Sequence, residues 1–335
     1  MAPTLKHIAE LLHLSKTTVS WVLSGKGEER GISPETRERV ERCAREIGYQ
    51  PNLIARSLNT GTSMVIGMIV PSIWDSYFAG IFHHVSEFAL RLGYSITLAQ
   101  TGNDPGKEEI AVHTFLSKKV DALIVASSAL PSTLLSSLQA SGFPIVYFDR
   151  YLENTSPCIS IDDRGTAHTL VEHLIRERGC RNIAMMTTNT HHLNIRRRQD
   201  GYRSALEENG IRVNERLVGV FPYTSDINPG PVLEHIFADN PDVDGIFFVT
   251  HALTTSSLVY LAQCDGGPLQ DKNIPMASIH HDPLFRSVNP RFDYADFPME
   301  EMSRAIMDTL LKQIRKEDAP TEGHLFIPPK YDYWN

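Results

Sequence analysis

Residues 15–25 read SKTTVSWVLSG, and the N-terminal part of the chain is arranged around them. Ser15 suits a helix N-cap, because its hydroxyl accepts a hydrogen bond from a backbone N–H that has no partner within the helix. Val19 and Val22 then fall on one helical face, while Lys16 points elsewhere. The segment predicts a short helix with a buried stripe and a polar N-terminal half.

A second amphipathic segment precedes this helix. Leu5, Ile8, Ala9 and Leu12 repeat at the spacing of one helical face, and a few residues around His13 join the two segments. Two short helices with so tight a turn are typical of a helix-turn-helix, whose second helix enters the DNA major groove. Taken alone, the pattern also fits an ordinary pair of helices in a helical core.

A third helix follows and strengthens the first alternative. Ser33, Pro34 and Glu35 supply an N-cap, a proline at the first position and an acid in the first turn. Gly48 ends the helix after an apolar stripe of Val40, Cys43, Ala44 and Ile47.

The run from LKHIAELL through SKTTVSWVLSG and ISPETRERVERCAREIGYQPN to LIARSL resembles the LacI/GalR (lactose-repressor) family of bacterial transcription regulators. The motifs occur in the family's order and end in its hinge, which favours the helix-turn-helix over the core hairpin. The resemblance implies a DNA-binding domain at 1–51, a hinge helix or linker at 52–60, and an effector-binding and dimerisation domain at 61–335.

Composition is consistent with a small DNA-binding appendage on a larger body. Residues 1–60 hold nine Lys and Arg against seven Glu, and subtraction from the totals of 32 basic and 40 acidic residues leaves 23 against 33 for residues 61–335. The positive surplus favours phosphate contact at the N-terminal end only, although it is a weak basic signal.

Several classes of function are disfavoured by absent motifs. The four cysteines show no CxxC spacing, and the sequence contains no HExxH, no Ser-His-Asp order and no glycine-rich phosphate loop. We therefore expect no metal, no cofactor and no enzymatic activity. No signal-peptide core or membrane-length apolar run is present, so the expected location is the cytoplasm.

From Met64 onward, short apolar runs alternate with longer amphipathic ones, which is typical of parallel sheets with helices on both faces. The runs form two series of about equal length: 64–70, 95–99, 122–126 and 145–148, then 158–161, 183–186, 217–221, 246–249 and 275–279. The sequence thus predicts an α/β body of two doubly wound parallel-sheet subdomains. Their strands would end at a shared, ligand-binding cleft.

This body resembles the periplasmic-binding-protein-like body of the same family. The resemblance places the strand near 292–297 and the helix near 299–314 in the first subdomain, and the C-terminal tail in the second. The implied boundaries are about 61–156 plus 291–318 for subdomain one, and about 157–290 plus 319–335 for subdomain two.

The resemblance also implies which residues contact DNA. Base edges would be read by Lys16, Thr17 and Trp21, and phosphates contacted by Ser15, Thr18 and Ser20. The loop at 26–31 departs from the family, because it is longer than in many members and holds two acids, but Arg30 in this loop is still expected to reach a phosphate. Lysine and threonine suit base edges, since they offer a donor to guanine and a hydroxyl or methyl group. Trp21 departs from the polar or basic residue usual there, and either lies against a thymine methyl or packs on the neighbouring loop.

The hinge would be helical only when two copies pair on DNA, because so short a helix is marginal in water. The residues implied here are Asn52, Ala55, Arg56 and Leu58. Leu58 matches the family's leucine that wedges into the minor groove and kinks the duplex. The alternative is a plain linker residue that packs on the body.

In the cleft, the expected effector-binding residues are Trp74, Asp75, Tyr77, Phe78, Asp149, Arg150, Arg198, Phe221, Thr250, His251 and Asp282. Aromatic rings beside polar groups suit a sugar or a base. Arg198 and Asp282 match the family's best-known effector contacts, the alternative being a structural ion pair across the cleft. Thr250-His251 departs from the Asn-Asp or Asp-Asp usual in the family.

The sequence therefore predicts a homodimeric, allosteric transcription regulator, most simply a repressor, that binds a palindromic operator on double-stranded DNA. A small molecule in the cleft, a sugar or sugar derivative, would control it. The alternatives are a purine-type, corepressor-dependent regulator and a periplasmic-type solute-binding protein, which is opposed by the DNA-binding module.

Overall fold

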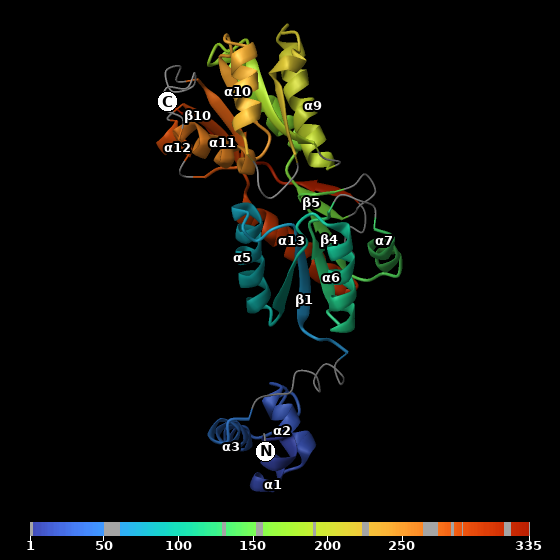
Figure 1. Cartoon of the computed structure of the whole chain (residues 1–335). Helices are drawn as coiled ribbons and strands as arrows, with labels where there is room; N and C mark the ends of the chain where they lie inside the picture. Colours follow the sequence, from blue (N-terminus) through green and yellow to red (C-terminus); the bar gives the residue numbers. More distant parts are fainter. Residues whose placement is uncertain are drawn as a thin grey trace. The chain divides into compact units, whose positions relative to one another are not determined.

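The computed structural model describes residues 3–49, 61–128, 132–151, 157–189, 192–222, 228–263, 274–282, 285–289, 291–317 and 323–334. The chain divides between Ser63 and Met64 into two units, here called the helical unit and the α/β body (Figure 1). The predicted hinge, residues 52–60, lies outside the described residues.

The described part of the helical unit contains three helices: α1 (Leu5–Leu12), α2 (Lys16–Leu23) and α3 (Pro34–Glu46). Each begins after a hydroxyl side chain that accepts a backbone N–H bond from the first turn, as predicted for Ser15 and Ser33. His13 adopts a left-handed conformation, with φ of 53°, and redirects the chain from α1 to α2. The predicted helix-turn-helix is therefore present.

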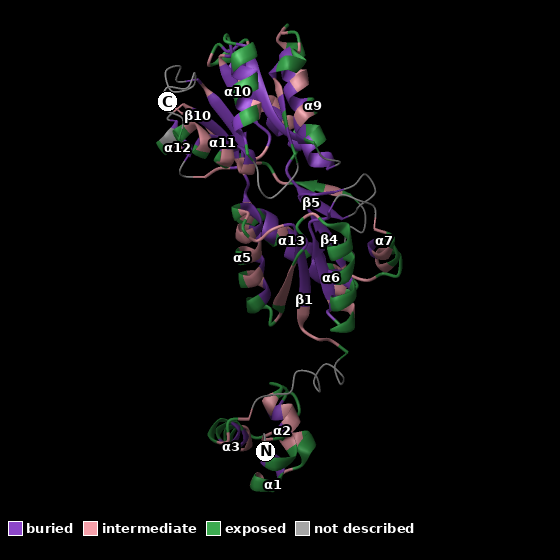
Figure 2. Cartoon of the chain, viewed as in Figure 1, coloured by how far each residue is buried: buried purple, intermediate pink, exposed green. Residues whose placement is uncertain are grey.

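One small apolar cluster holds these helices together (Figure 2). Ile8, Val19 and Val40, one from each helix, are completely buried. They are surrounded by Ala9, Val22, Cys43 and Ala44. Because the cluster is small, it occupies only one face of α2, and the polar residues at the start of that helix remain outside it.

The α/β body contains two six-stranded sheets (Figure 1). In spatial order the first sheet consists of β11 (His324–Phe326), β5 (Cys158–Ser160), β4 (Ile145–Phe148), β3 (Ala122–Val125), β1 (Val65–Val70) and β2 (Ser95–Gln100). The second consists of β12 (Lys330–Asp332), β10 (Phe292–Asp296), β9 (Met276–Ile279), β8 (Gly245–Phe248), β6 (Ile183–Asn189) and β7 (Val218–Pro222). Neighbouring strands are parallel except for β10 and β12.

Two sheet assignments made from the sequence are wrong. β5 pairs with β4 in the first sheet, although it was expected to open the second series. β10 pairs with β9 in the second sheet, although it was expected to return to the first. Of the C-terminal tail, β12 joins the second sheet as expected, whereas β11 joins the first. A short apolar run specifies a strand but not its sheet, because the partners lie far away in sequence.

Helices cover the sheets. Those of the first sheet are α5 (Ser76–Arg91), α6 (Pro105–Ser117), α7 (Thr133–Ala140) and α13 (Met299–Arg315). Those of the second are α8 (Asp163–Arg176), α9 (Leu193–Glu208), α10 (Gly230–Asp239), α11 (His251–Gln263) and α12 (Phe285–Val288), with a 3₁₀ turn at Glu215–Leu217. α13 packs on α5 and β4, so its predicted place beside the first sheet is confirmed.

The central strands form the buried interior of the body, whereas the edge strands β2, β11 and β12 and the outer faces of helices such as α6 and α10 are more exposed (Figure 2). Polar residues follow several of the strands: Asp149 directly after β4, His280 directly after β9, and Thr250 two residues after the end of β8. Among the described residues, no helix is long and apolar enough to span a membrane.

Candidate functional site

The first candidate surface is the start of α2. Lys16 and Thr17 are exposed, while Thr18 and Ser20 are half-buried. The hydroxyls of Ser15 and Thr18 lie 2.8 Å apart, and the Ser15 hydroxyl accepts the Thr18 backbone N–H at 2.9 Å. The first turn holds no acidic residue, so its backbone N–H groups favour a nearby anion.

Trp21 contacts the loop that follows α2. The guanidinium carbon of Arg30 lies 5.3 Å from the centre of the Trp21 ring, within the range of a cation–π contact. The loop is held in place by backbone hydrogen bonds from Lys26 to Trp21 and from Arg30 to Lys26. Of the two alternatives for Trp21, the structure therefore favours packing on the loop.

One of the two acids in this loop is paired. Glu28 lies 3.1 Å from Arg37 of α3, which reduces its repulsion of an approaching phosphate. The predicted hinge contacts, Asn52, Ala55, Arg56 and Leu58, fall outside the described residues and stay predictions.

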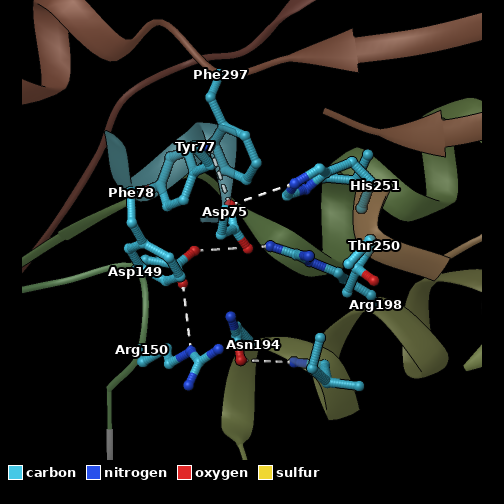
Figure 3. Close-up of a pocket in the computed structure, with 13 residues that line it drawn as sticks. Asp75, Tyr77, Phe78, Asp149, Arg150, Asn194, Arg198, Thr250, His251 and Phe297 are labelled. Atoms are coloured by element: carbon cyan, nitrogen blue, oxygen red, sulfur yellow. Dashed lines mark hydrogen bonds and ion pairs between the residues drawn. The ribbon is translucent and has the colours of Figure 1, made fainter. Parts of the chain in front are cut away.

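The second candidate site is a pocket between the two sheets of the α/β body, here called the cleft pocket (Figure 3). Its volume is about 90 Å³. Since one water needs roughly 10–15 Å³ on this measure, the pocket holds several waters or a small ring. It is lined by Asp75, Tyr77, Phe78, Asp149, Arg150, Asn194, Ile195, Arg198, Thr250, His251, Ala252, Ile279 and Phe297.

Eight of the residues expected to bind effector line this pocket: Asp75, Tyr77, Phe78, Asp149, Arg150, Arg198, Thr250 and His251. The other three, Trp74, Phe221 and Asp282, are not among the residues that line it. Trp74 is 92% exposed, because its neighbour Asp75 turns inward to cap α5. Phe221 is completely buried on the inner side of β7. Asp282 follows His280, whose φ of 73° redirects the chain, and is not among the lining residues.

Arg198 of α9 bonds to several protein groups around the cleft pocket. Its Nε donates to Asp163 Oδ1 at 2.8 Å, and its Nη1 donates to the Val249 carbonyl oxygen, also at 2.8 Å. Its Nη2 lies 3.9 Å from Asp149 Oδ1, which belongs to the first sheet. The neighbouring carboxylates raise the pKa of Arg198, although burial acts in the opposite direction.

Asp163, the main partner of Arg198, was not predicted from the sequence. It stands at the start of α8, directly after Asp162, which already caps the helix through Gly165 N–H. One acid is enough to cap a helix, so the second acid of the pair Asp162-Asp163 was the feature of the sequence that could have indicated a further role. Burial raises the pKa of Asp163 to about 7, against the charge of Arg198.

Close packing of α8 and α9 sets the distance between these two side chains. Gly201 lies on α9, one turn after Arg198, and a Cβ there would come within 2.3 Å of the Arg164 carbonyl oxygen and 2.8 Å of the Ala167 Cβ. Glycine is therefore required at this position for α9 to approach α8 as it does.

Asp149 lies between the two arginines of the pocket. It has a left-handed backbone conformation, with φ of 56°, which turns its side chain into the cleft where β4 ends. Its Oδ2 is 3.9 Å from Arg150 Nε, and its Oδ1 is 3.9 Å from Arg198. Burial raises the pKa of Asp149, and the two arginines act against this.

A second pair links the two sides of the pocket. Asp75 Oδ1, at the start of α5, lies 3.2 Å from His251 Nε2, at the start of α11 (Figure 3). Burial disfavours the charged carboxylate, but the hydrogen bond and charge of His251 outweigh it and lower the pKa of Asp75. The centres of the His251 and His280 rings lie 4.9 Å apart.

Arg150 also contacts residues on both sides of the cleft pocket. Its Nη1 donates to Asn103 Oδ1 and lies 3.4 Å from His192 Nε2, and its guanidinium stands 5.3 Å from the Phe78 ring. The arrangement offers carboxylate acceptors and guanidinium donors beside aromatic rings, which suits a hydroxylated ring. Among the residues described, no group of His, Cys, Asp and Glu is arranged to hold a metal ion.

Comparison with known proteins matches both units. Residues 4–52 match the model of bacterial regulatory proteins of the lacI family. Residues 63–277 match the model of periplasmic binding proteins and the sugar-binding domain of the LacI family.

Two curated relatives cover nearly the whole chain. The ribose operon repressor of Halalkalibacterium halodurans is 27% identical, covering 95% of this chain and 92% of the relative. The sucrose operon repressor of Klebsiella pneumoniae is 29% identical, covering 97% and 96%.

Among solved structures, the lac repressor dimer bound to operator and the anti-inducer ONPF superimposes with a TM-score of 0.83. The identity is 19%, and the match covers 100% of this chain and 99% of that one, so it supports the fold. A helix-turn-helix joined to a two-sheet body with a cleft defines a DNA-binding transcription regulator with an effector-binding domain, rather than an enzyme. The chain belongs to the LacI family.

Proposed function

We propose that this protein is a homodimeric repressor whose affinity for a palindromic operator is set by a small sugar bound in the cleft pocket. The observation that carries the proposal is the set of charged contacts across the pocket. Asp149 meets Arg198, and Asp75 meets His251, each pair joining the first sheet to the second. A ligand that replaces or strengthens these contacts changes how the two sheets are held together.

On the DNA side, we assign Lys16 and Thr17 to base edges, because both are exposed at the start of α2. Ser15, Thr18 and Ser20 lie beside them, and their backbone N–H groups and hydroxyls suit phosphates. Trp21 acts as a positioning residue that holds Arg30 toward a phosphate. The hinge residues would add minor-groove contacts when two copies pair.

The coupling between the sites follows from differential affinity. If the sugar binds one arrangement of the two sheets better than the other, it shifts the population toward that arrangement. Repression responds only if the two arrangements also differ in operator affinity. The repressors of the ribose and sucrose operons, the relatives described above, support the sugar class for this chain.

The aromatic side chains argue against the purine alternative. Tyr77 and Phe78 are almost completely buried and pack edge to face, with ring centres 5.1 Å apart. Tyr77 also packs on Phe297, with ring centres 4.4 Å apart. These rings pack against one another, which leaves less of their faces for stacking on a flat base.

The direct test is operator binding by fluorescence anisotropy, with DNA selected by the protein from a random pool. We expect a preference for a palindrome over its half-site, and log K falling with log salt by about 0.9 for each phosphate contacted. A sugar that raises the melting temperature should change the operator affinity.

Two lysine variants control for charge. Lys16→Ala should weaken operator binding, whereas Lys107→Ala, in the exposed part of α6, should not. Salt-independent binding, or equal affinity for the half-site, would contradict the dimeric repressor.

A further inference from the structure

The arginine and aspartate side chains that line the cleft pocket carry equal numbers of opposite charges before any ligand enters. Arg150 and Arg198 supply two positive charges, and Asp75 and Asp149 supply two negative charges. A third carboxyl group, Asp163, lies directly behind Arg198 at 2.8 Å. Even with Asp163 protonated, the arginines give the pocket no surplus of positive charge over its carboxylates.

Two nitrogens of the Arg198 guanidinium are held by hydrogen bonds to the protein, and the third faces a carboxylate. Nε and Nη1 donate to Asp163 and to the Val249 carbonyl oxygen, and Nη2 faces Asp149. The side chain is almost completely buried. Turning it toward an anionic ligand would leave Asp163 buried without its cation, which is strongly unfavourable.

Arg150 is engaged in a similar way. Its Nη1 donates to Asn103, its Nε lies 3.9 Å from Asp149, and its plane stands over Phe78. His251, the remaining positive candidate at the pocket, is paired with Asp75 at 3.2 Å. Each of these three groups therefore already faces a protein acceptor.

A phosphate or carboxylate on the ligand would add negative charge beside Asp75 and Asp149 in a partly buried site. Repulsion between like charges is strong in such an environment. Neutral hydroxyl groups behave differently, because they donate to carboxylates and accept from guanidinium groups without changing the charge balance. The pocket also offers the neutral side chains of Asn194 and Thr250.

We propose that the cleft pocket selects neutral polyhydroxylated ligands and excludes phosphorylated sugars and sugar acids, with Asp75 and Asp149 as the residues that exclude them. This inference rests on the proposed sugar site. It goes further in naming the charge class of the ligand and the two carboxylates that set it.

The experiment is isothermal titration of the full chain with matched pairs of ligands: ribose and ribose 5-phosphate, glucose and glucose 6-phosphate, and glucose and gluconate. We expect at least one neutral member to bind, and its charged counterpart to bind about 100-fold more weakly or worse. If the charged member of a pair binds as well as the neutral one, the inference is wrong and the sugar site stands. If no member of any pair binds, the proposed sugar site fails, and the inference fails with it.

Two variants test the assigned residues. Asp149→Asn and Asp75→Asn each remove one negative charge from the pocket while keeping the side-chain size. Each should reduce the preference for the neutral ligand by about tenfold or more. Asp308→Asn, in the exposed part of α13, is the matched control and should leave the preference unchanged.

Thermal melting identifies variants that fail to fold, and the use of two independent positions keeps the test decisive. An unchanged preference in a folded Asp149→Asn or Asp75→Asn protein would overturn the role of that carboxylate.

Discussion

In the helical unit, the polar side chains assigned to DNA stand outside a small apolar core, whereas three charged side chains of the cleft pocket, Asp149, Arg150 and Arg198, are themselves buried. Lys16 and Arg30 are exposed, and Val19 and Val40 hold the helices together beneath them. In the cleft pocket, Arg198 both faces the ligand space and bonds to the protein. Function and stability are therefore separable in the first region and linked in the second.

The physical reason is the cost of burying charge. An exposed lysine keeps its water until DNA replaces it, so its removal changes binding and little else. A buried guanidinium must be paired to be tolerated, and its removal leaves the partner carboxylates unpaired. The following predictions test this difference between the two regions, beginning with the largest expected effect.

Arg198→Met should lower the free energy of unfolding of the α/β body by about 3–5 kcal/mol, because Asp163 and Asp149 lose their cation. Chemical denaturation followed by circular dichroism measures this. The double variant Asp163→Leu/Arg198→Met should recover much of the loss, since the buried Asp163 carboxyl is then absent and Asp149 still lies 3.9 Å from Arg150. A loss below about 1 kcal/mol in the single variant would show that the pair is not structural.

Alanine substitutions at Gly201 and Gly25 distinguish the cost of a steric clash from the cost of an unfavourable backbone conformation. Gly201→Ala places a methyl group 2.3 Å from the Arg164 carbonyl oxygen, so it should cost about 1–3 kcal/mol of unfolding free energy and weaken effector binding. Gly25→Ala in the helical unit meets no atom within 4 Å but has a φ of +77°. It should cost about 1 kcal/mol and leave effector binding unchanged. A larger loss of unfolding free energy in Gly25→Ala than in Gly201→Ala would contradict this prediction.

Trp21→Ala and Arg30→Ala should reduce operator affinity while changing the stability of the helical unit by less than about 1 kcal/mol. Arg30→Ala should also reduce the salt slope by about one, as expected when one phosphate contact is lost. Arg39→Ala, an exposed position on α3, is the control for charge. If Trp21→Ala weakens binding with an unchanged salt slope, Trp21 contacts DNA itself and does not act through Arg30.

The smallest effect concerns pH. Burial lowers the pKa of His280, while its bond to Asp296 acts against this, and His251, Asp75 and Tyr77 also face its ring. A lowered pKa means that the folded state favours the neutral ring, so stability is lost as the pH falls below about 6.5. When the pH is lowered from 7.5 to 5.5, the melting temperature of His280→Gln should fall by less than that of the natural protein. An equal loss would assign the pH dependence to other groups.

Much of the fold was predictable because helix periodicity, caps and apolar runs are local properties of the sequence. Ser15 and Ser33 cap the helices expected of them, and the strands begin and end close to the predicted residues. The sheets that receive β5 and β10 were not predictable in this way. Their pairing depends on partners that no short window contains.

In the cleft pocket too, some residues could be predicted from local sequence and others could not. Residues at or just beyond the end of a predicted strand, such as Asp149 and Thr250, were identified from their position in the sequence. Asn194 and Phe297 were missed, since one lies on a helix and the other in a connection that follows a misassigned strand. Asp163 was missed because its role depends on the close contact of α8 with α9.

The order of strands in the two sheets has a consequence for synthesis on the ribosome. The first sheet is completed by β11, which pairs with β5 across more than 160 residues of sequence, and α13 packs on α5 across more than 200. The second sheet is completed by β12, later still. The described contacts of the helical unit, in contrast, join residues within 4–49. During chain growth from the N-terminus, the part that recognises DNA can therefore form long before the part that controls it.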